Sequence, residues 1–106
     1  MSRIVIVGYK PKPGCDDQLA ALMKTHVPRL RDEGLATDRQ SIVMRTADGT
    51  FVEVFEWVSE AAMQAAHSNP NVQKMWAEYA ELCDYVPVGD LPESAELFSS
   101  FSSFDA

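Results

Sequence analysis

The sequence predicts an α+β fold of the ferredoxin-like kind, with the order β-α-β-β-α-β, a four-stranded antiparallel sheet and helices on one face. Three observations carry this prediction. Residues 39–46 and 50–58 are rich in β-branched and aromatic residues and flank Asp48-Gly49, as in a β-hairpin. A further β-rich run covers residues 3–10. Segments with helical apolar spacing follow both the first strand and the hairpin.

The length and charge of the chain limit the number of domains and the kinds of partner to expect. A chain of 106 residues with 46% hydrophobic residues is long enough for one core, so we expect a single domain over 1–106, with a weakly structured tail from about residue 92. The net charge of -7 opposes binding to a phosphate backbone or an anionic membrane, since both need clustered Lys and Arg. We therefore expect no nucleic-acid partner and no membrane partner.

The cysteines and the N-terminal segment bear on location. Cys15 and Cys83 show no paired spacing, which is typical of reduced thiols in a soluble protein. The apolar run 4–7 is too short for the core of a signal peptide, and no stretch is long enough to span a membrane. The sequence therefore predicts a cytoplasmic protein.

The first half of the chain predicts one strand and one long helix. Residues 3–10 are apolar on both faces of a strand, which indicates a central position in the sheet. After a turn rich in Pro and Gly, two aspartates favour a helix start because carboxylates stabilise the positive end of the helix dipole. We expect this helix over about 16–33, with a bend near 24–25 because Pro28 lacks a backbone N–H.

The second half predicts a short helix, a longer helix and a last strand. Ser59 is a favourable N-cap for the short helix, which we expect to end near His67. Pro70 favours a break and the start of the longer helix. The apolar face of that helix holds Val72, Met75, Trp76, Tyr79, Leu82 and Cys83. The last strand is either 85–88 or 97–104, and the pattern does not decide between them.

The second strand of the hairpin is largely apolar on both faces. Phe51, Phe55 and Trp57 share one face with Glu53, while three valines share the other with Glu56. Helices on one side cover only one face, and the other face would leave an apolar patch larger than soluble monomers usually expose. The pattern therefore predicts a homodimer that packs sheet against sheet about a two-fold axis.

Four segments of the chain carry a family resemblance. They are Lys12-Pro13-Gly14, Gly34-Leu35, the hairpin run 48–57, and the stretch from Ala66-His67-Ser68-Asn69-Pro70 to Trp76. With these segments the chain, over about 5–92, resembles the antibiotic biosynthesis monooxygenase-like family of the dimeric α+β barrel superfamily. None of them is a catalytic signature. The resemblance implies a homodimer whose two sheets form a barrel, with a small-molecule pocket between sheet and helices in each subunit.

The resemblance also implies a class of chemistry. The superfamily includes cofactor-independent monooxygenases of aromatic polyketides, haem-degrading monooxygenases, and many proteins without a known activity. The haem-degrading members carry an Asn on the first strand, which this chain lacks. By resemblance we expect a cofactor-independent monooxygenase-like enzyme, without a cofactor, acting on a small aromatic or polyketide-like substrate. The alternative is a non-catalytic homodimer that binds a small ligand or has a structural role.

Two histidines are candidate catalytic residues. His26 lies on the predicted buried stripe of the first helix, where it is either a base in a pocket or a structural histidine with satisfied hydrogen bonds. His67 closes the short helix, where it either takes part in the chemistry or caps carbonyl groups. Two histidines on separate helices, without a carboxylate at fixed spacing, are weak evidence for a metal, so we expect no metal site.

Glu53 is the third candidate and the most unusual one. A carboxylate between Phe51 and Phe55 on one strand face must be paired, protonated or close to water. It is either a general base that removes an acidic substrate proton or the ion-pair partner of Arg45 or Arg39 on the neighbouring strand.

Aromatic residues supply candidate walls for a ligand. Trp57, Trp76 and Tyr79 would line a pocket for a flat molecule, although rings at regular spacing are also typical of a core. In such a pocket a base would remove a substrate proton, and the resulting carbanion would react directly with O₂. The sequence thus predicts a dry aromatic pocket with one poised base.

Overall fold

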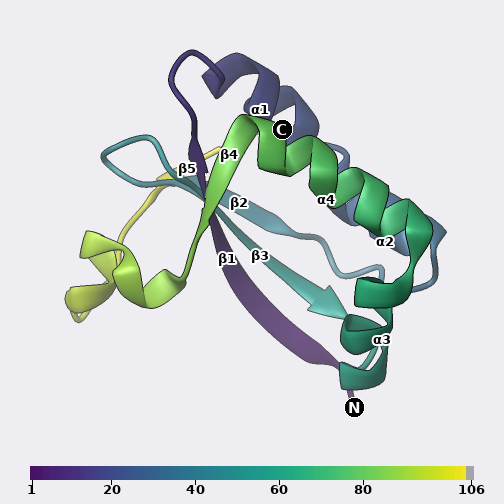
Figure 1. Cartoon of the computed structure of the whole chain (residues 1–106). Helices are drawn as coiled ribbons and strands as arrows, with labels where there is room; N and C mark the ends of the chain where they lie inside the picture. The colour runs from purple at the N-terminus through teal and green to yellow at the C-terminus, as the bar shows by residue number, and fades with distance from the viewer. Residues whose placement is uncertain (105–106) are drawn as a thin grey trace.

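An antiparallel sheet carries helices on one face in the computed structural model of the chain, which describes residues 1–104 (Figure 1). The strands are β1 (Arg3–Pro11), β2 (Ile42–Arg45), β3 (Phe51–Trp57), β4 (Cys83–Val86) and β5 (Ser102–Ser103). The α-helices are α1 (Asp16–Met23), α2 (His26–Asp32), α3 (Glu60–Ala65) and α4 (Pro70–Leu82). Three short 3₁₀ helices are η1 (Ala66–Ser68), η2 (Val88–Asp90) and η3 (Pro92–Ala95).

The sheet order is β4-β1-β3-β2-β5, and every pairing in it is antiparallel. This confirms the predicted α+β fold, but the sheet has five strands where four were expected. Both candidate segments for the last strand contribute, because β1 and β2 each offer a free edge after pairing with β3. Gly8 marks the close approach of β1 and β4, since a Cβ there would lie 2.6 Å from the Val86 carbonyl oxygen.

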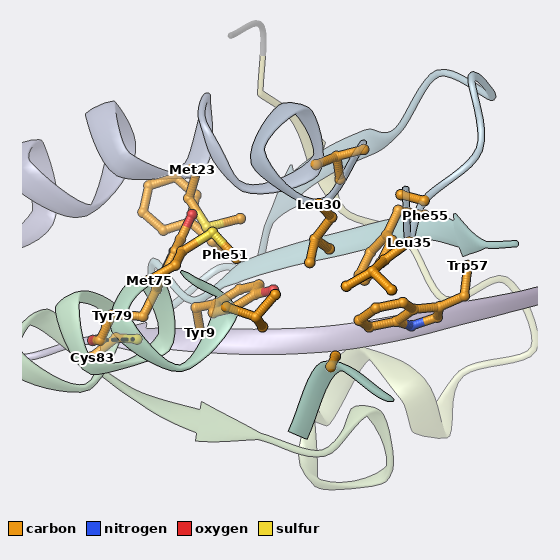
Figure 2. Close-up of a cluster of buried hydrophobic side chains, with 14 of the residues drawn as sticks. Tyr9, Met23, Leu30, Leu35, Phe51, Phe55, Trp57, Met75, Tyr79 and Cys83 are labelled. Carbon is orange, nitrogen blue, oxygen red and sulfur yellow. Dashed lines mark hydrogen bonds between the residues drawn. The ribbon is translucent and has the colours of Figure 1, made fainter. Parts of the chain in front are cut away.

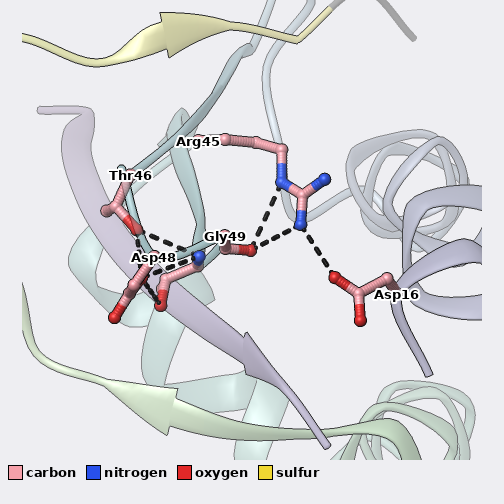
Figure 3. Close-up of polar contacts among 6 residues, drawn as sticks. Asp16, Arg45, Thr46, Asp48 and Gly49 are labelled. Atoms are coloured by element: carbon pink, nitrogen blue, oxygen red, sulfur yellow. Dashed lines mark hydrogen bonds and ion pairs between the residues drawn. The ribbon is translucent and has the colours of Figure 1, made fainter. Parts of the chain in front are cut away.

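Hydrogen bonds from side chains of the hairpin stabilise its turn (Figure 3). Gly49 adopts a positive φ of 93°, and the Thr46 hydroxyl donates a hydrogen bond to the Asp48 carboxylate. The Arg45 guanidinium spans the turn, donating to the Gly49 carbonyl at 2.7 Å and to the Asp16 carboxylate at 3.0 Å. Hydrogen bonds within the hairpin therefore stabilise the turn, and the ion pair of Arg45 with Asp16 connects it to the start of α1.

The helix expected over 16–33 is interrupted rather than bent. Its two parts, α1 and α2, are separated at Lys24 and Thr25. Pro28 has no N–H for the carbonyl four residues earlier and crowds it, so the chain turns there. The Thr25 hydroxyl instead donates to the Leu22 carbonyl at 2.8 Å. As a consequence His26 is the first residue of α2 and points into the protein, with only 3% of its surface exposed.

The predicted N-cap at Ser59 and the predicted helix start at Pro70 are confirmed. Ser59 accepts a hydrogen bond from the Ala62 amide at 3.0 Å, which starts α3. Asn69 does the same for Val72 at 3.1 Å, just before Pro70 begins α4. Ser59 therefore fixes the start of α3, and Asn69 fixes the start of α4.

The core lies between the sheet and α1, α2 and α4. Figure 2 shows the rings of Tyr9, Phe55 and Trp57 on the face of the sheet that the helices cover. Leu19, Leu30, Phe51 and Tyr79 are completely buried. Burial of these apolar groups holds the helices on the sheet, at about 25 cal/mol for each Å² removed from water.

The opposite face of the sheet is only partly covered. After β4 the chain folds over one end of that face, where Leu91 is 3% exposed and η2 lies against β1 (Figure 1). Elsewhere Ile4, Ile6 and Ile42 remain 58%, 47% and 57% exposed. Among the described residues, no helix is both long and apolar enough to cross a membrane.

Candidate functional site

A cavity of about 360 Å³ lies between the helix-covered face of the sheet and α2, α3 and α4. Its walls are Val5, Val7, Tyr9, His26, Phe55, Trp57, Met63, Trp76 and Tyr85. Tyr85 is 48% exposed and marks the rim, whereas Trp57 is 5% exposed and lies deep. The cavity is therefore an apolar, aromatic chamber of a size that suits a small molecule.

A buried polar cluster lies at the wall of this cavity. His26 Nδ1 is 2.8 Å from Glu53 Oε1, and the Tyr9 hydroxyl donates to the same oxygen at 2.9 Å. Glu53 is 0% exposed, and its Oε2 has no hydrogen-bond partner among residues 1–104. The cluster thus connects three segments that are far apart in the sequence, because Tyr9 of β1 and His26 of α2 both contact the Glu53 carboxylate of β3.

The hydrogen bonds set the tautomer of His26. An ionised carboxylate only accepts hydrogen bonds, so with Glu53 ionised a neutral imidazole carries its proton on Nδ1 and leaves Nε2 as an acceptor. No residue of the described chain forms a hydrogen bond with Nε2. The ring is held by edge contacts with Phe55 and Tyr79, both at 5.3 Å between centroids. His26 can thus accept a proton from a molecule in the cavity.

The tyrosines beside His26 remain neutral phenols. Burial, reinforced by the Glu53 carboxylate, raises the pKa of Tyr9 well above its ordinary value. Burial also raises the pKa of Tyr79, whose hydroxyl donates to the Leu22 carbonyl at 2.7 Å. Tyr9 is therefore a hydrogen-bond donor to Glu53 and not a second base.

The expected arginine partners of Glu53 are wrong. Arg39 Nε lies 3.1 Å from a carboxylate oxygen of Glu56, on the other face of the sheet, and Arg45 pairs with Asp16. Arg39 therefore lies on the face away from Glu53, whereas Arg45 shares the face of Glu53 but lies over the Phe51 ring and reaches toward the start of α1. The carboxylate of Glu53 therefore has His26 as its ionisable hydrogen-bond donor instead of an arginine.

The remaining predicted site residues divide between the cavity and its surroundings. Trp57 and Trp76 line the cavity, while Tyr79 does not line it and supports the ring of His26 from behind. His67 is exposed and packs edge-on against Trp76, with 5.3 Å between ring centroids. The structure therefore brings His26 and Glu53 together and leaves His67 outside.

Sequence reasoning missed Tyr9 and the other β1 residues of the cavity. A usable signal was present, because Val5, Val7 and Tyr9 alternate along β1 and face the same side as Phe55, the antiparallel partner of Val5. Met63 and Tyr85 gave no such signal. Over residues 1–104, no three His, Cys, Asp or Glu side chains gather into a group that could hold a metal ion.

Comparison with solved structures identifies the fold. Rv0793 from Mycobacterium tuberculosis is 22% identical with a TM-score of 0.62, covering 81% of this chain and 91% of that chain. A structure described as an antibiotic biosynthesis monooxygenase is 22% identical with a TM-score of 0.61, covering 81% and 92%. A variant of SnoaB, a cofactor-independent oxygenase from Streptomyces nogalater, is 10% identical with a TM-score of 0.67, covering 80% and 86%.

These likenesses concern the fold. No protein-family model and no curated protein sequence matches the chain. Other similar structures include NE2512 from Nitrosomonas europaea, a protein of unknown function, at 21% identity and a TM-score of 0.57 over 78% of this chain and 84% of that chain. The resemblance noted in the sequence is thus confirmed as a shared fold with antibiotic biosynthesis monooxygenase-like proteins.

Proposed function

We propose that this chain, which has the fold of the antibiotic biosynthesis monooxygenase-like proteins, is a cofactor-independent monooxygenase-like enzyme. Its substrate is a small aromatic or polyketide-like molecule that enters the apolar cavity. The observation that carries the proposal is the position of His26, a buried imidazole on the cavity wall with Nδ1 bound to Glu53. A base in an otherwise apolar aromatic chamber suits proton abstraction from a flat, weakly acidic substrate.

The reaction needs only the substrate, O₂ and a base. His26 Nε2 removes one acidic proton, from the activated methylene group or from the hydroxyl of its enol tautomer. Both give the same electron-rich anion, which then reacts with O₂. Overall, a CH₂ group and O₂ become a C=O group and water, so the substrate supplies all of the electrons. Apolar walls such as Phe55 and Trp57 keep water away from the anion.

The similar structures support this proposal without extending to a substrate. SnoaB is described as a cofactor-independent oxygenase, and the two folds match over 80% of this chain and 86% of the SnoaB chain. The catalytic assignment rests on this chain's own residues, because the identity to SnoaB is only 10%. We assign the base to His26 and the aromatic walls to Trp57 and Trp76.

Oxygen uptake tests the proposal. We would measure it with a panel of hydroxylated aromatic compounds that carry an activated methylene group. His26→Gln should lower kcat/KM by about 10²–10⁴-fold, the range typical of losing a general base. His67→Gln, which removes the imidazole outside the cavity, should leave the rate unchanged.

Two results would contradict the proposed oxygenase reaction. Equal uptake by the wild type and His26→Gln would remove His26 from the reaction. Quenching of Trp57 or Trp76 fluorescence by aromatic compounds, without any oxygen uptake, would favour the alternative of a non-catalytic ligand-binding protein.

We also propose that two copies pair through the uncovered face of the sheet. Ile4, Ile6 and Ile42 are about half exposed there, and an apolar sheet face of this kind is typical of an interface. Light scattering should give twice the 11.8 kDa mass of one chain. Ile6→Asp combined with Ile42→Asp should give the single-chain mass, and a wild type of 11.8 kDa would contradict the pairing.

A further inference from the structure

We propose that the cavity binds hydroxyaromatic molecules as anions, with the ligand's proton held on His26 and the resulting positive charge balanced by the buried carboxylate of Glu53. This inference rests on the proposed function, because it assigns the ionisation state of the ligand at the same site. Glu53 does not line the cavity, so its role is to position and balance the group that does.

The geometry leaves one ring nitrogen for the ligand. Glu53 Oε1 accepts hydrogen bonds from both Tyr9 and His26 Nδ1, which fixes the orientation of the imidazole. Since Nδ1 is occupied, Nε2 is the nitrogen that remains for a ligand beside His26. A hydroxyl group in the cavity would meet an acceptor there rather than a donor.

The charge around Glu53 favours a protonated His26 in the complex. Glu53 is completely buried, and no Lys or Arg in the described part of the chain lies within ion-pair distance of it. A buried carboxylate without a cation is unfavourable, and its Oε2 also lacks a partner. A proton on His26 places a cation 2.8 Å from Oε1, in surroundings where charges interact strongly.

The proton transfer adds no net charge to the cavity. The O–H bond of the ligand breaks and an N–H bond forms at Nε2, with no change in oxidation state. Glu53, His26 and the ligand together carry one negative charge before the transfer and one after it. The imidazolium then lies between two anions, the carboxylate behind it and the ligand in front.

The other titratable groups near His26 do not compete for the charge. Tyr9 from β1 and Tyr79 from α4 face the imidazole, and burial holds both as neutral phenols. Tyr85 from β4 lies at the rim, and burial raises its pKa to about 12. The residues of the cavity wall include no Lys, Arg, Asp or Glu, which favours a neutral weak acid over a permanently charged ligand.

A chromophoric phenol tests the inference directly. The probe is 4-nitrophenol, whose neutral and anionic forms absorb at different wavelengths. In a buffer about one unit below its own pKa, roughly a tenth of the free probe is ionised. Bound to the wild type, the probe should show the anion spectrum.

The variants separate the roles of the two residues. His26→Gln should abolish the anion spectrum. Glu53→Gln should raise the pH at which the bound probe is half ionised by about one unit or more, since it removes a charge-assisted hydrogen bond to the imidazolium. Glu56→Gln, the matched change of a buried glutamate on the same strand, should cause no shift. The methyl ether 4-nitroanisole should bind all of them and reports that each variant has kept its cavity.

The outcomes are distinct from those of the oxygenase test. An anion spectrum in the wild type without oxygen uptake would support this inference and end the oxygenase proposal. A neutral spectrum for the bound probe, or no binding of the probe at all, would overturn the inference whether or not oxygen is consumed. Suppose that Glu53→Gln still binds 4-nitroanisole and that the bound 4-nitrophenol is half ionised at the same pH as in the wild type. Glu53 would then not balance the charge of His26. If Glu53→Gln does not fold, a retained anion spectrum in His26→Gln overturns the inference instead.

Discussion

Glu53 and Glu56 are two buried carboxylates on β3 that point to opposite faces of the sheet. Glu56 accepts hydrogen bonds from Ser2 and Thr37, both at 2.7 Å, and from Arg39 at 3.1 Å. Glu53 has only neutral or titratable donors and one oxygen without a partner. One strand therefore carries both a fully satisfied glutamate and an incompletely satisfied one.

The difference indicates a structural role for Glu56 and supports the role proposed for Glu53. The bonds of Glu56 join the N-terminus, β3 and the loop before β2, which stabilises the fold. Glu53 lies against a cavity and is buried at a cost in stability, because its charge has no permanent counterion. Residues that break the rules of a stable core without local compensation are expected at functional sites.

The largest effect should follow from removing the carboxylate of Glu53 alone. Glu53→Leu leaves the Nδ1 proton of His26 and the hydroxyl of Tyr9 buried without an acceptor. We expect the free energy of unfolding to fall by about 2–5 kcal/mol. Urea unfolding followed by tryptophan fluorescence measures this, and a loss under about 1 kcal/mol would contradict the expected burial cost.

Removing all three members of the cluster should restore most of that stability. Tyr9→Phe, His26→Leu and Glu53→Leu together leave no unsatisfied donor, and apolar replacements of buried charged groups are often neutral or stabilising by about 1–4 kcal/mol. We therefore expect the triple variant to unfold at a higher urea concentration than Glu53→Leu, yet to lose the anion spectrum of a bound phenol. A triple variant as unstable as the single one would show that packing, and not the orphaned donors, causes the loss.

A smaller effect should appear at alkaline pH through Tyr9. Its pKa is raised, chiefly by burial and then by the charge of Glu53, so its contribution to stability is complete below about pH 10 and is lost as the pH rises toward the folded-state pKa. In that range one raised phenol contributes a slope of about 1.4 kcal/mol per pH unit. Tyr9→Phe should flatten the alkaline stability curve by this amount. Parallel curves for the two proteins would contradict it.

The smallest effect should come from Glu56 at acid pH. Its pKa is lowered by hydrogen bonds from Thr37 first, then from Ser2, with Arg39 adding to them. The stability it contributes is present above about pH 4.5 and is lost as the pH falls through the lower folded-state pKa. Urea midpoints of the wild type and Glu56→Gln should therefore converge on acidification, whereas a constant difference would show that ionisation of Glu56 does not matter.

Much of the fold could be predicted because its signals are local. Asp48-Gly49 supplies the turn of the hairpin, Ser59 caps α3, and Pro70 starts α4, all as expected. The effect of Pro28 was placed correctly but underestimated, since the bend near residues 24–25 is a complete break between α1 and α2. Such features depend on a few neighbouring residues, so a single sequence contains the information.

The candidate site could be predicted only in part. Both His26 and Glu53 stood out, the first by its helical stripe and the second by its aromatic neighbours. Their contact could not be derived, because two residues that are 27 positions apart in the chain leave several ways to place α2 against β3. The same uncertainty gave Glu53 the wrong arginine partners and left its bond with Tyr9 unforeseen.

The sequence by itself determined the order of the elements, the hairpin and its turn, the N-cap of α3, the start of α4 and the two-sided apolarity of β3, because these follow from propensity and spacing over short distances. Only the tertiary structure decided that Glu53 faces His26 while Glu56 takes Arg39, that His67 lies outside the cavity, and that β4 and β5 both join the sheet. The physical reason is that each of these outcomes depends on contacts between segments far apart in the chain. Hydrophobic periodicity shows that a face will be covered, and packing decides which residues cover it.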